Sequence, residues 1–295
     1  MKKICIIFNP KAGSSKLAKF KKIVAELNKN NLVTLFETTA AGDATNIART
    51  ESVNFDIIVA AGGDGTINEV VNGINPNTSL AIIPMGTANI VAIEAGISNS
   101  SKVICDAINR GKTKKVYVPK INNKKFILMI GIGYDAKVVN NIDLKLKKIF
   151  GKLVFVFEGL KQFFKLKEFN IVVTSNNETY YANWVLITNA QHYAGPHSIT
   201  KQTNIFKEDL VCYLFQDLTK LSFLYNLFLI FFYGDLSKSK KIKIIQSKTF
   251  EVRSQQKTPI QCDGELFGYL PVTIKNNKEF LKLISNFSFF YSCQY

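Results

Sequence analysis

Short runs of consecutive apolar residues alternate with segments of helical periodicity over residues 1–110. The apolar runs at residues 4–8 and 57–61 are typical of strands buried on both faces, and residues 33–38 and 79–83 are also strand-like. Apolar spacing of three or four residues predicts helices over residues 16–29, 43–52, 88–95 and 101–110, with a further helix beginning near Thr66. Alternating strands and helices predict an open parallel α/β sheet.

The pattern changes near residue 115. Strand-like stretches follow at residues 125–132, 170–175, 180–188, 210–215, 241–246, 248–253 and 270–275. Turn pairs such as Asn122-Asn123 and Asn176-Asn177 separate many of them, which is typical of antiparallel β structure, as a sandwich or an open barrel. We expect an α/β domain over residues 1–115 and a β-rich domain over 116–295, with the C-terminal residues as candidates for packing back on the first domain.

Composition excludes several classes of protein. The chain has 295 residues, of which 47% are hydrophobic, so general disorder is excluded. No apolar stretch is long enough for a membrane-spanning helix. The net charge of +16 has three interpretations: a solvated basic surface, attraction to an anionic membrane or ligand, and nucleic-acid binding. No nucleic-acid-binding module is recognisable, so we expect no nucleic-acid partner.

The cysteines and the N-terminus indicate a cytosolic protein. The five cysteines are scattered without a Cys-x-x-Cys pair, and there are two histidines, so a zinc site is not expected. Scattered thiols suit a reducing compartment. The N-terminal apolar run is too short for the core of a signal peptide.

Two apolar segments of the second half carry lysines. Residues 144–167 have the pattern of a basic amphipathic helix, with seven lysines among apolar positions. Residues 221–233 are a dense apolar and aromatic run of 13 residues, too short to span a bilayer but suited to docking on one. Packing in the protein core is the alternative for both segments.

Three glycine-containing turns follow predicted parallel strands. They are Asn9-Pro10-Lys11-Ala12-Gly13, the block from Gly62 to Glu69, and Pro84-Met85-Gly86-Thr87-Ala88-Asn89. Ligands bind at the carboxyl edge of open α/β sheets, so three turns converging there predict a phosphate-binding site. The first turn alone is explained about as well by an ordinary strand–helix connection.

The second turn has the densest signal. Its glycines would let the backbone approach a polyphosphate, Thr66 could cap the helix or bind phosphate, and Asp64 could hold a metal ion. It lacks the lysine of a Walker loop and differs from the dinucleotide fingerprint.

Two carboxylates flank a glycine at Asp263-Gly264-Glu265. One interpretation is a general base that deprotonates an acceptor hydroxyl, and the other is a type I′ hairpin turn, for which Asp-Gly is a favoured pair.

Together these motifs resemble the diacylglycerol kinase catalytic-domain family, and more narrowly the soluble bacterial lipid kinases related to diacylglycerol and sphingosine kinases. The resemblance covers nearly the whole chain and includes the segments Gly131–Ala136 and Gly151-Lys152-Leu153. The Gly-Gly-Asp-Gly-Thr block is shared with NAD kinases and phosphofructokinases, whereas Asp-Gly-Glu and Gly-Ile-Gly-Tyr-Asp-Ala narrow the resemblance.

The resemblance implies a two-domain fold with the active site between the domains, and ATP and Mg²⁺ as cofactors. It implies Glu265 as the base, with Asp263 supporting it or bound to metal. Asp64 is the implied ligand for the magnesium of the nucleotide. The residues implied for nucleotide binding are Asn9, Pro10, Lys11, Ala12, Gly13, Thr38, Gly62, Gly63, Asp64, Gly65, Thr66, Ile67, Asn68, Gly86, Thr87 and Asn89.

The chain departs from the family pattern at two places. Ile90 stands where many members carry an acidic residue after Gly-Thr-x-Asn. Members also carry a structural magnesium site near an Asp-Gly pair, where this chain has Glu208-Asp209. The ion could be held by Glu208 with the backbone oxygens of Ile205 and Leu210, or be lost.

We therefore expect an ATP- and Mg²⁺-dependent kinase of phospholipid metabolism that phosphorylates a lipid hydroxyl, such as that of diacylglycerol. Its partners would be the lipid substrate and an anionic membrane surface, with peripheral association at the inner face, and a homodimer is left open. The alternatives are a non-catalytic nucleotide- or lipid-binding relative and a soluble-substrate kinase of the NAD kinase type.

Overall fold

The computed structural model describes residues 1–13, 16–140, 169–193, 197–216 and 219–285, and its chain divides into two compact units. The first unit comprises Met1–Tyr117 together with the residues from Phe280 onward, and the second comprises Val118–Glu279. The chain thus leaves the first unit after Tyr117 and re-enters it at Phe280. The predicted basic helix at residues 144–167 lies outside the described residues.

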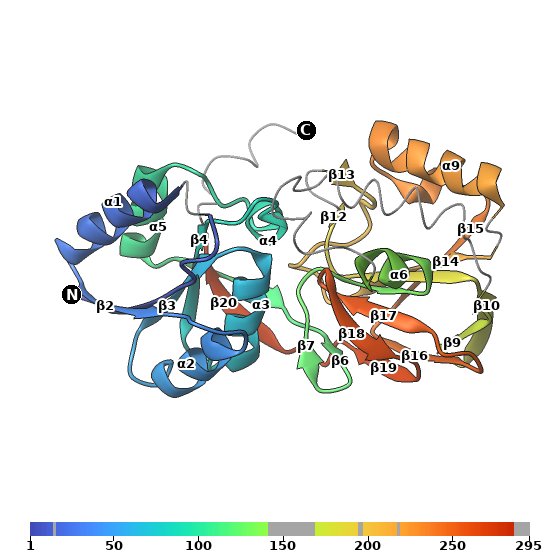
Figure 1. The fold of residues 1–295 in the computed structure, drawn as a ribbon, viewed down its shortest axis with the longest axis horizontal. Coiled ribbons are helices and arrows are strands. Elements are labelled where there is room, and N and C mark those ends of the chain that lie inside the picture. Colours follow the sequence, from blue (N-terminus) through green and yellow to red (C-terminus); the bar gives the residue numbers. More distant parts are fainter. Residues whose placement is uncertain (14–15, 141–168, 194–196, 217–218, 286–295) are drawn as a thin grey trace. The chain divides into compact units, whose positions relative to one another are not determined.

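A six-stranded sheet forms the centre of the first unit (Figure 1). Its strands, in chain order, are β1 (Lys3–Phe8), β2 (Leu32–Glu37), β3 (Ile57–Gly62), β4 (Ser79–Pro84), β5 (Thr113–Tyr117) and β20 (Phe280–Ile284). They lie side by side in the order β2-β1-β3-β4-β20-β5. All neighbouring pairs are parallel except β20 with β5, which is antiparallel.

Helices cover both faces of this sheet, which is why its central strands β1, β3 and β4 are buried at every position after the first residue. The helices are α1 (Leu17–Asn28), α2 (Asp43–Glu51), α3 (Asp64–Gly73), α4 (Ile90–Glu94) and α5 (Ser101–Arg110). Helices α1 and α5 lie on one face, and α2 and α3 lie on the other (Figure 1). The apolar face of α1, with Phe20, Ile23 and Leu27, is buried against the sheet. The predicted parallel α/β domain is confirmed, with one antiparallel strand at its edge.

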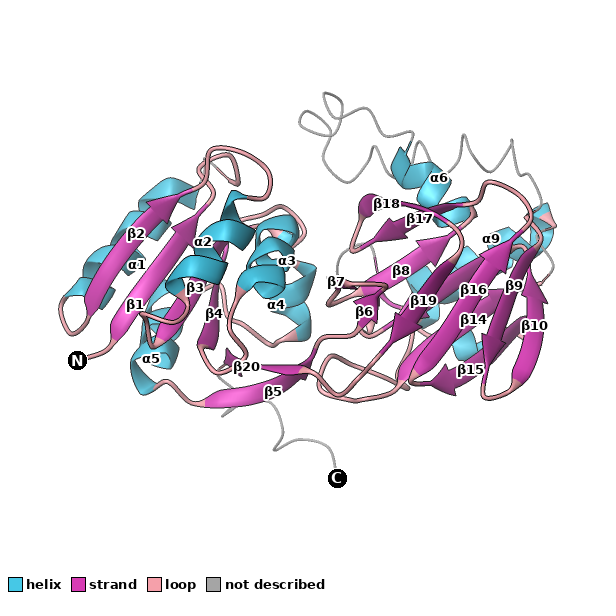
Figure 2. Cartoon of the chain, turned by 90° about the horizontal axis from the view of Figure 1, so that it is seen from below, coloured by secondary structure: helices cyan, strands magenta, loops and turns pink. Residues whose placement is uncertain are grey.

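Two antiparallel sheets form the second unit (Figure 2). One has the order β10-β9-β16-β19-β6-β7, the other β15-β14-β11-β8-β17-β18, and β12 pairs with β13. The strands are β6 (Lys120–Ile121), β7 (Lys124–Lys125), β8 (Met129–Ile132), β9 (Ile171–Ser175), β10 (Glu178–Ala182), β11 (Trp184–Thr188), β12 (His192–Tyr193), β13 (His197–Ser198), β14 (Leu210–Phe215), β15 (Ile242–Ser247), β16 (Thr249–Ser254), β17 (Pro259–Cys262), β18 (Glu265–Tyr269) and β19 (Val272–Lys275).

The helical elements of the second unit are few among the described residues. They are α6 (Tyr134–Asn140), α9 (Lys220–Phe228), the π-helical turn η2 (Leu229–Tyr233) and the 3₁₀ turn η3 (Leu236–Lys238). No helix in the described part of the chain combines the length and apolar character needed to cross a membrane.

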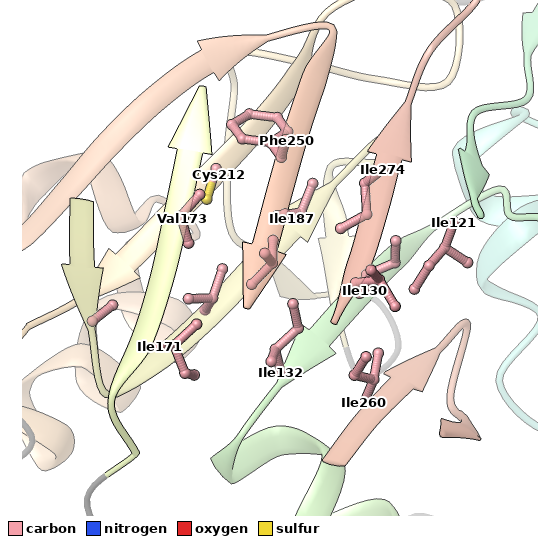
Figure 3. Packing of buried hydrophobic residues seen from close by; sticks show 14 of the residues in the cluster. Ile121, Ile130, Ile132, Ile171, Val173, Ile187, Cys212, Phe250, Ile260 and Ile274 are labelled. Atoms are coloured by element: carbon pink, nitrogen blue, oxygen red, sulfur yellow. The ribbon is translucent and has the colours of Figure 1, made fainter. Parts of the chain in front are cut away.

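The core of the second unit lies between its two sheets. Alternate residues of each strand point into it, so that Ile171 and Val173 meet Ile130, Ile187 and their neighbours from the other sheet (Figure 3). Of the two predicted architectures, the structure is the sandwich.

Two predicted strands differ from the observed ones. The stretch 180–188 is two strands of different sheets, β10 and β11, which separate at Asn183. The stretch 125–132 is regular only from Met129, because the residues before it give their backbone N–H groups to a side chain, that of Asp263.

Strand β20 lies between β4 and β5, so its buried side chains should stabilise the sheet of the first unit. We expect Leu283→Ala to destabilise the first unit by about 2–4 kcal/mol, through lost apolar contacts and the cavity left behind. Urea unfolding followed by far-UV circular dichroism measures this loss. Lys282→Ala, on the neighbouring half-buried residue, is the control and should change stability by less than about 0.5 kcal/mol. Equal effects of the two changes would contradict this role of β20.

Candidate functional site

Four loops gather at one edge of the first unit's sheet. They follow β2, β1, β3 and β4, which are consecutive neighbours in the sheet. Backbone hydrogen bonds tie the loops together, from Asn9 N to Ala61 O (3.0 Å), from Met85 N to Gly62 O (2.9 Å) and from Thr38 N to Phe8 O (2.9 Å). The predicted phosphate-binding turns therefore lie side by side.

Asn9 links the first loop to the helix that follows the third strand. Its side-chain Nδ2 donates to Thr66 Oγ1 at 3.1 Å, and its side-chain Oδ1 accepts from the N–H of Lys11 at 3.0 Å. Thr66 lies inside α3, which begins at Asp64 with Gly63 as its N-cap. Thr66 therefore does not cap the helix, one of the two roles predicted for it, because the helix begins two residues before it.

Close approach of backbones explains the glycines. A Cβ at Gly86 would lie 2.7 Å from Gly63 Cα, and a Cβ at Gly13, where φ is +73°, would lie 2.1 Å from Met85 O. The loops thus present backbone rather than side chains. The first N–H groups of α3 have no partner within the helix, so they are suited to an anion such as a phosphate.

Two lysines hold these loops. Lys16 Nζ donates to Gly86 O at 2.7 Å, and Lys11 Nζ donates to Thr39 O at 3.0 Å. Sequence reasoning missed Lys16, whose only signal was its position directly before α1. Asp43 supports the same edge by accepting hydrogen bonds from Thr39 and Ala40. The two backbone hydrogen bonds, from Ala40 and then Thr39, hold the pKa of the Asp43 carboxyl below its usual value.

Asp64 and Asn89 fit a bound nucleotide with its magnesium ion. Asp64 Oδ1 accepts from the N–H of Val91 at 2.9 Å, so this carboxylate also caps α4. Asn89 Nδ2 donates to Gly86 O at 2.8 Å, while its Oδ1 is buried and has no hydrogen-bond partner among the described residues. A ligand group that donates a hydrogen bond would satisfy this oxygen.

Other predicted positions have a structural role. Ile67 is fully buried and its N–H donates to Gly63 O, so we assign this residue to packing. Asn68 is also buried, and both its backbone and its side-chain oxygens accept from Asn72 Nδ2.

In the second unit, the Asp263-Gly264 pair forms a hairpin turn between β17 and β18. Both residues have positive φ, +50° and +85°, as a type I′ turn requires. The carboxylate of Asp263 accepts three consecutive backbone N–H groups at 2.8–2.9 Å, those of Ile127, Leu128 and Met129. Asp263 is thus a positioning residue in this structure.

A buried polar chain supports the turn from the other side. The N–H of Gly264 donates to Gln261 Oε1 at 2.8 Å, and Gln261 Nε2 donates to Asp135 Oδ2 at 2.6 Å. The hydroxyl of Tyr193 donates to the other oxygen of Asp135. Burial raises the pKa of both the Asp135 carboxyl and the Tyr193 hydroxyl, so Tyr193 stays protonated as a donor. The motif Gly131–Ala136 pointed to Asp135, but nothing in the sequence pointed to Tyr193.

Gly131 leaves the space that Asp135 fills. A Cβ at this position would lie 2.0 Å from Asp135 Oδ2 and 2.7 Å from Gln261 Nε2. The glycine of the Gly-Ile-Gly-Tyr-Asp-Ala segment is therefore required by the hydrogen-bond chain that holds the turn.

Glu265 differs from Asp263 in the exposure and the hydrogen bonding of its carboxylate. It is exposed, and its side chain has no hydrogen bond or ion pair with any described residue. The structure brings the two acids onto one turn and leaves Glu265 available to act on a substrate.

A lysine ammonium lies beside the carboxylate of Glu208, at the predicted metal position. This carboxylate lies 2.6 Å from Lys248 Nζ and 3.9 Å from Lys278 Nζ, and the backbone oxygen of Glu208 accepts from Asn276 Nδ2 at 2.7 Å. The ammonium group of Lys248 thus neutralises the carboxylate of Glu208, which was predicted to bind a metal ion together with the backbone oxygens of Ile205 and Leu210. No cluster of three acidic, histidine or cysteine side chains exists among the residues described.

The two acids of the turn should differ sharply in their effect on stability. We expect Asp263→Asn to destabilise the second unit by about 1–3 kcal/mol, because the amide cannot accept all three N–H groups. We expect Glu265→Gln to change stability by less than about 0.5 kcal/mol. Urea unfolding followed by the fluorescence of Trp184, the single tryptophan, measures the second unit alone. Equal stabilities of the two variants would refute the separation of roles.

The Glu208–Lys248 pair predicts a second unit whose stability does not depend on magnesium. Without nucleotide, the melting temperature followed by Trp184 fluorescence should be the same in excess Mg²⁺ and in a chelator. Lys248→Met leaves Glu208 without its nearest cation and should make the melting temperature rise with Mg²⁺. A wild-type protein that melts earlier in the chelator would show that Glu208 holds an ion.

Two family models match the two halves of the chain. The model of the family described as "Diacylglycerol kinase catalytic domain" matches residues 3–121. The model described as "YegS C-terminal NAD kinase beta sandwich-like domain" matches residues 128–285.

Three individual proteins illustrate the similarity. A diacylglycerol kinase of Staphylococcus saprophyticus is 28% identical over 96% of this chain and 95% of its own, and one of Bacillus subtilis is 26% identical over 92% of both chains. A crystal structure of a diacylglycerol kinase from Bacillus anthracis has the same fold, with a TM-score of 0.80 at 24% identity over 96% of this chain and 97% of that one. The chain with these backbone-lined loops and this Asp-Gly-Glu turn belongs to the diacylglycerol kinase catalytic-domain family.

Proposed function

We propose that this protein is an ATP- and Mg²⁺-dependent lipid kinase that transfers the γ-phosphoryl group to a lipid hydroxyl at the cytoplasmic surface of the membrane. The acceptor class is diacylglycerol or a related lipid with a hydroxyl beside an apolar body. Relatives named diacylglycerol kinase support this class of substrate.

The arrangement of the Asp-Gly-Glu turn is the observation that carries the proposal. A general base must be free to reach the substrate while its backbone is held in place. Glu265 is exposed, and it follows a turn that the Asp263 carboxylate ties to three backbone N–H groups. This combination is expected of a catalytic carboxylate, and a plain hairpin turn does not require it.

The loops of the first unit suit the phosphates of ATP. Their backbone approaches too closely for a Cβ at Gly13 or Gly86, and the N-terminus of α3 attracts negative charge. Asp64 and Asn89 would hold the magnesium ion and its water, and one or two carboxylates are enough for magnesium bound to nucleotide phosphates. Magnesium would neutralise charge on the transferring phosphoryl group.

In the proposed reaction Glu265 takes the proton of the lipid hydroxyl as its oxygen attacks the γ-phosphorus. The new bond joins that oxygen to phosphorus, and the bond from phosphorus to the oxygen bridging to ADP breaks. The products are a phosphorylated lipid, ADP and the proton on Glu265.

The intact base counts against a non-catalytic relative. The alternative of an NAD kinase type of enzyme shares the Gly-Gly-Asp-Gly-Thr loop but has no use for a lipid-facing surface. The assay below separates both alternatives from a lipid kinase.

We expect the wild-type protein to transfer labelled γ-phosphate from ATP to a lipid of a mixed extract in the presence of Mg²⁺. Glu265→Gln should lower kcat by about 10²–10⁴-fold, the usual contribution of a general base, while ATP binding stays unchanged. Glu251→Gln, an exposed glutamate in β16 of the same unit, is the matched control and should keep full activity.

Mass spectrometry of the labelled product would name the acceptor. Label in NAD but in no lipid would establish the soluble-substrate kinase, and ATP binding without transfer to either would establish the non-catalytic relative. Full activity of Glu265→Gln would remove Glu265 as the base.

A further inference from the structure

Helix α9 buries polar residues and exposes apolar ones, and the turn η2 that continues it buries Leu229 and Ile230 but exposes Phe232 and Tyr233. Ser222 and Asn226 are 1% and 3% exposed, and they lie one helical turn apart on the side that faces the protein. Surface helices of water-soluble domains have the reverse arrangement, with apolar residues inward and polar residues outward.

The outward side of this segment is apolar and aromatic. Leu221 and Phe232, at its two ends, are 78% and 75% exposed. Their spacing follows the helical repeat, so the exposed side chains form one stripe, which we call the α9 face. Its residues are Leu221, Leu224, Tyr225, Phe228, Phe232 and Tyr233. A contiguous exposed apolar surface of this kind marks an interaction site.

Hydrogen bonds hold the segment in this orientation. Asn226 Oδ1 accepts from the hydroxyl of Ser239 at 2.8 Å, and both residues are buried. At the start of the helix, Thr219 Oγ1 accepts from the N–H of Ser222 at 3.3 Å. Beyond η2, the N–H of Leu236 donates to Ile199 O at 2.9 Å, which ties the segment to the sandwich (Figure 1). The inverted arrangement is thus part of the fold.

Lysines flank the α9 face in the sequence, and one of them contacts it. Residues 219–243 contain five lysines and a single acidic residue, Asp235. The carboxylate of Asp235 caps η3 by accepting from the N–H of Ser237 at 2.9 Å. Lys238 and Lys240 are exposed, and Lys238 Nζ lies 4.1 Å from the centre of the Tyr233 ring. A basic rim beside an apolar and aromatic stripe is complementary to an anionic lipid surface.

We propose that the α9 face inserts into the headgroup region of an anionic lipid bilayer and holds the second unit, with Glu265, at the membrane surface. The segment lies in the interface rather than across the bilayer, because its apolar run has 13 residues. A second copy of the chain is a poorer occupant, since pairing two α9 faces would bring their lysines together. The inference rests on the proposed lipid kinase for its purpose, but its test does not.

Flotation of the full-length chain with vesicles tests the inference directly. The wild type should bind vesicles of phosphatidylcholine with phosphatidylglycerol at low salt, and more weakly when salt screens the lysines. Leu221→Ser with Phe232→Ser should lower binding at least about tenfold, since it removes the two most exposed apolar side chains of the face. Both changes are at exposed positions, so the fold should be kept, as circular dichroism would verify.

The matched control is Leu32→Ser with Tyr181→Ser, an aliphatic and an aromatic residue that are 51% and 67% exposed elsewhere on the molecule. This control should bind like the wild type. Lys238→Glu with Lys240→Glu should reduce binding to that seen with pure phosphatidylcholine vesicles. Brominated lipid should quench the tryptophan fluorescence of Phe232→Trp more strongly than that of the wild type, whose single tryptophan, Trp184, is buried.

Unchanged binding of the Leu221 and Phe232 double variant would overturn the inference. It would also be overturned if sedimentation showed a wild-type dimer that this variant separates, since the face would then belong to a second copy. A water-soluble short-chain diacylglycerol distinguishes docking from catalysis, because the double variant should phosphorylate it like the wild type while losing activity on vesicles. Vesicle binding by a wild type that phosphorylates no lipid would keep the docking face and reject the proposed kinase.

Discussion

Three consecutive backbone N–H groups end on one carboxylate, that of Asp263, and the architecture of the candidate catalytic turn depends on this contact. Hydrogen bonds from backbone N–H groups to an ionised carboxylate are stronger than neutral ones. Here they join the turn between β17 and β18 to the segment that leads into β8. The irregular backbone before Met129 follows from that contact, because Ile127 and Leu128 give their N–H groups to this carboxylate.

The second support of the turn has a different physical character. Asp135, Gln261 and Tyr193 are linked by hydrogen bonds within the protein, where an unpaired polar group would be costly. Each member satisfies the next, and Gly131 provides the space that the chain needs. The turn is therefore fixed from both sides, by an ionic anchor and by a buried polar chain.

Much of this fold could be predicted from the sequence, because the pattern of apolar residues in a strand reflects how many of its faces are buried. Strands β1, β3 and β4 are nearly continuous apolar runs, since helices cover both faces of the sheet, and they lie where those runs predicted them. The loop positions followed from the carboxyl ends of these strands.

What could not be predicted depends on contacts between residues distant in the sequence. The spacing of apolar residues does not indicate which side chain will accept a given backbone N–H group. The hydrogen bond from the N–H of Ile127 to Asp263 could therefore not be predicted, and neither could the hydrogen bonds of Lys16 and Tyr193. The apolar run at residues 221–233 could pack inward or face outward, and the fold does both, since Leu229 and Ile230 are buried whereas Leu221 and Phe232 are exposed. The ion pair between Glu208 and Lys248 likewise depends on the fold, since 40 residues separate the two.

The position of β20 has a consequence for synthesis of the chain. This strand lies between β4 and β5, and β5 pairs with it alone, so the sheet of the first unit is complete only when the last part of the chain is available. The second unit is continuous, so on the ribosome it can finish folding before the first. Until then β4 has an open edge, of the kind that recruits strands from other chains. The nascent protein would thus carry its second unit in final form while the sheet of its first unit is still incomplete.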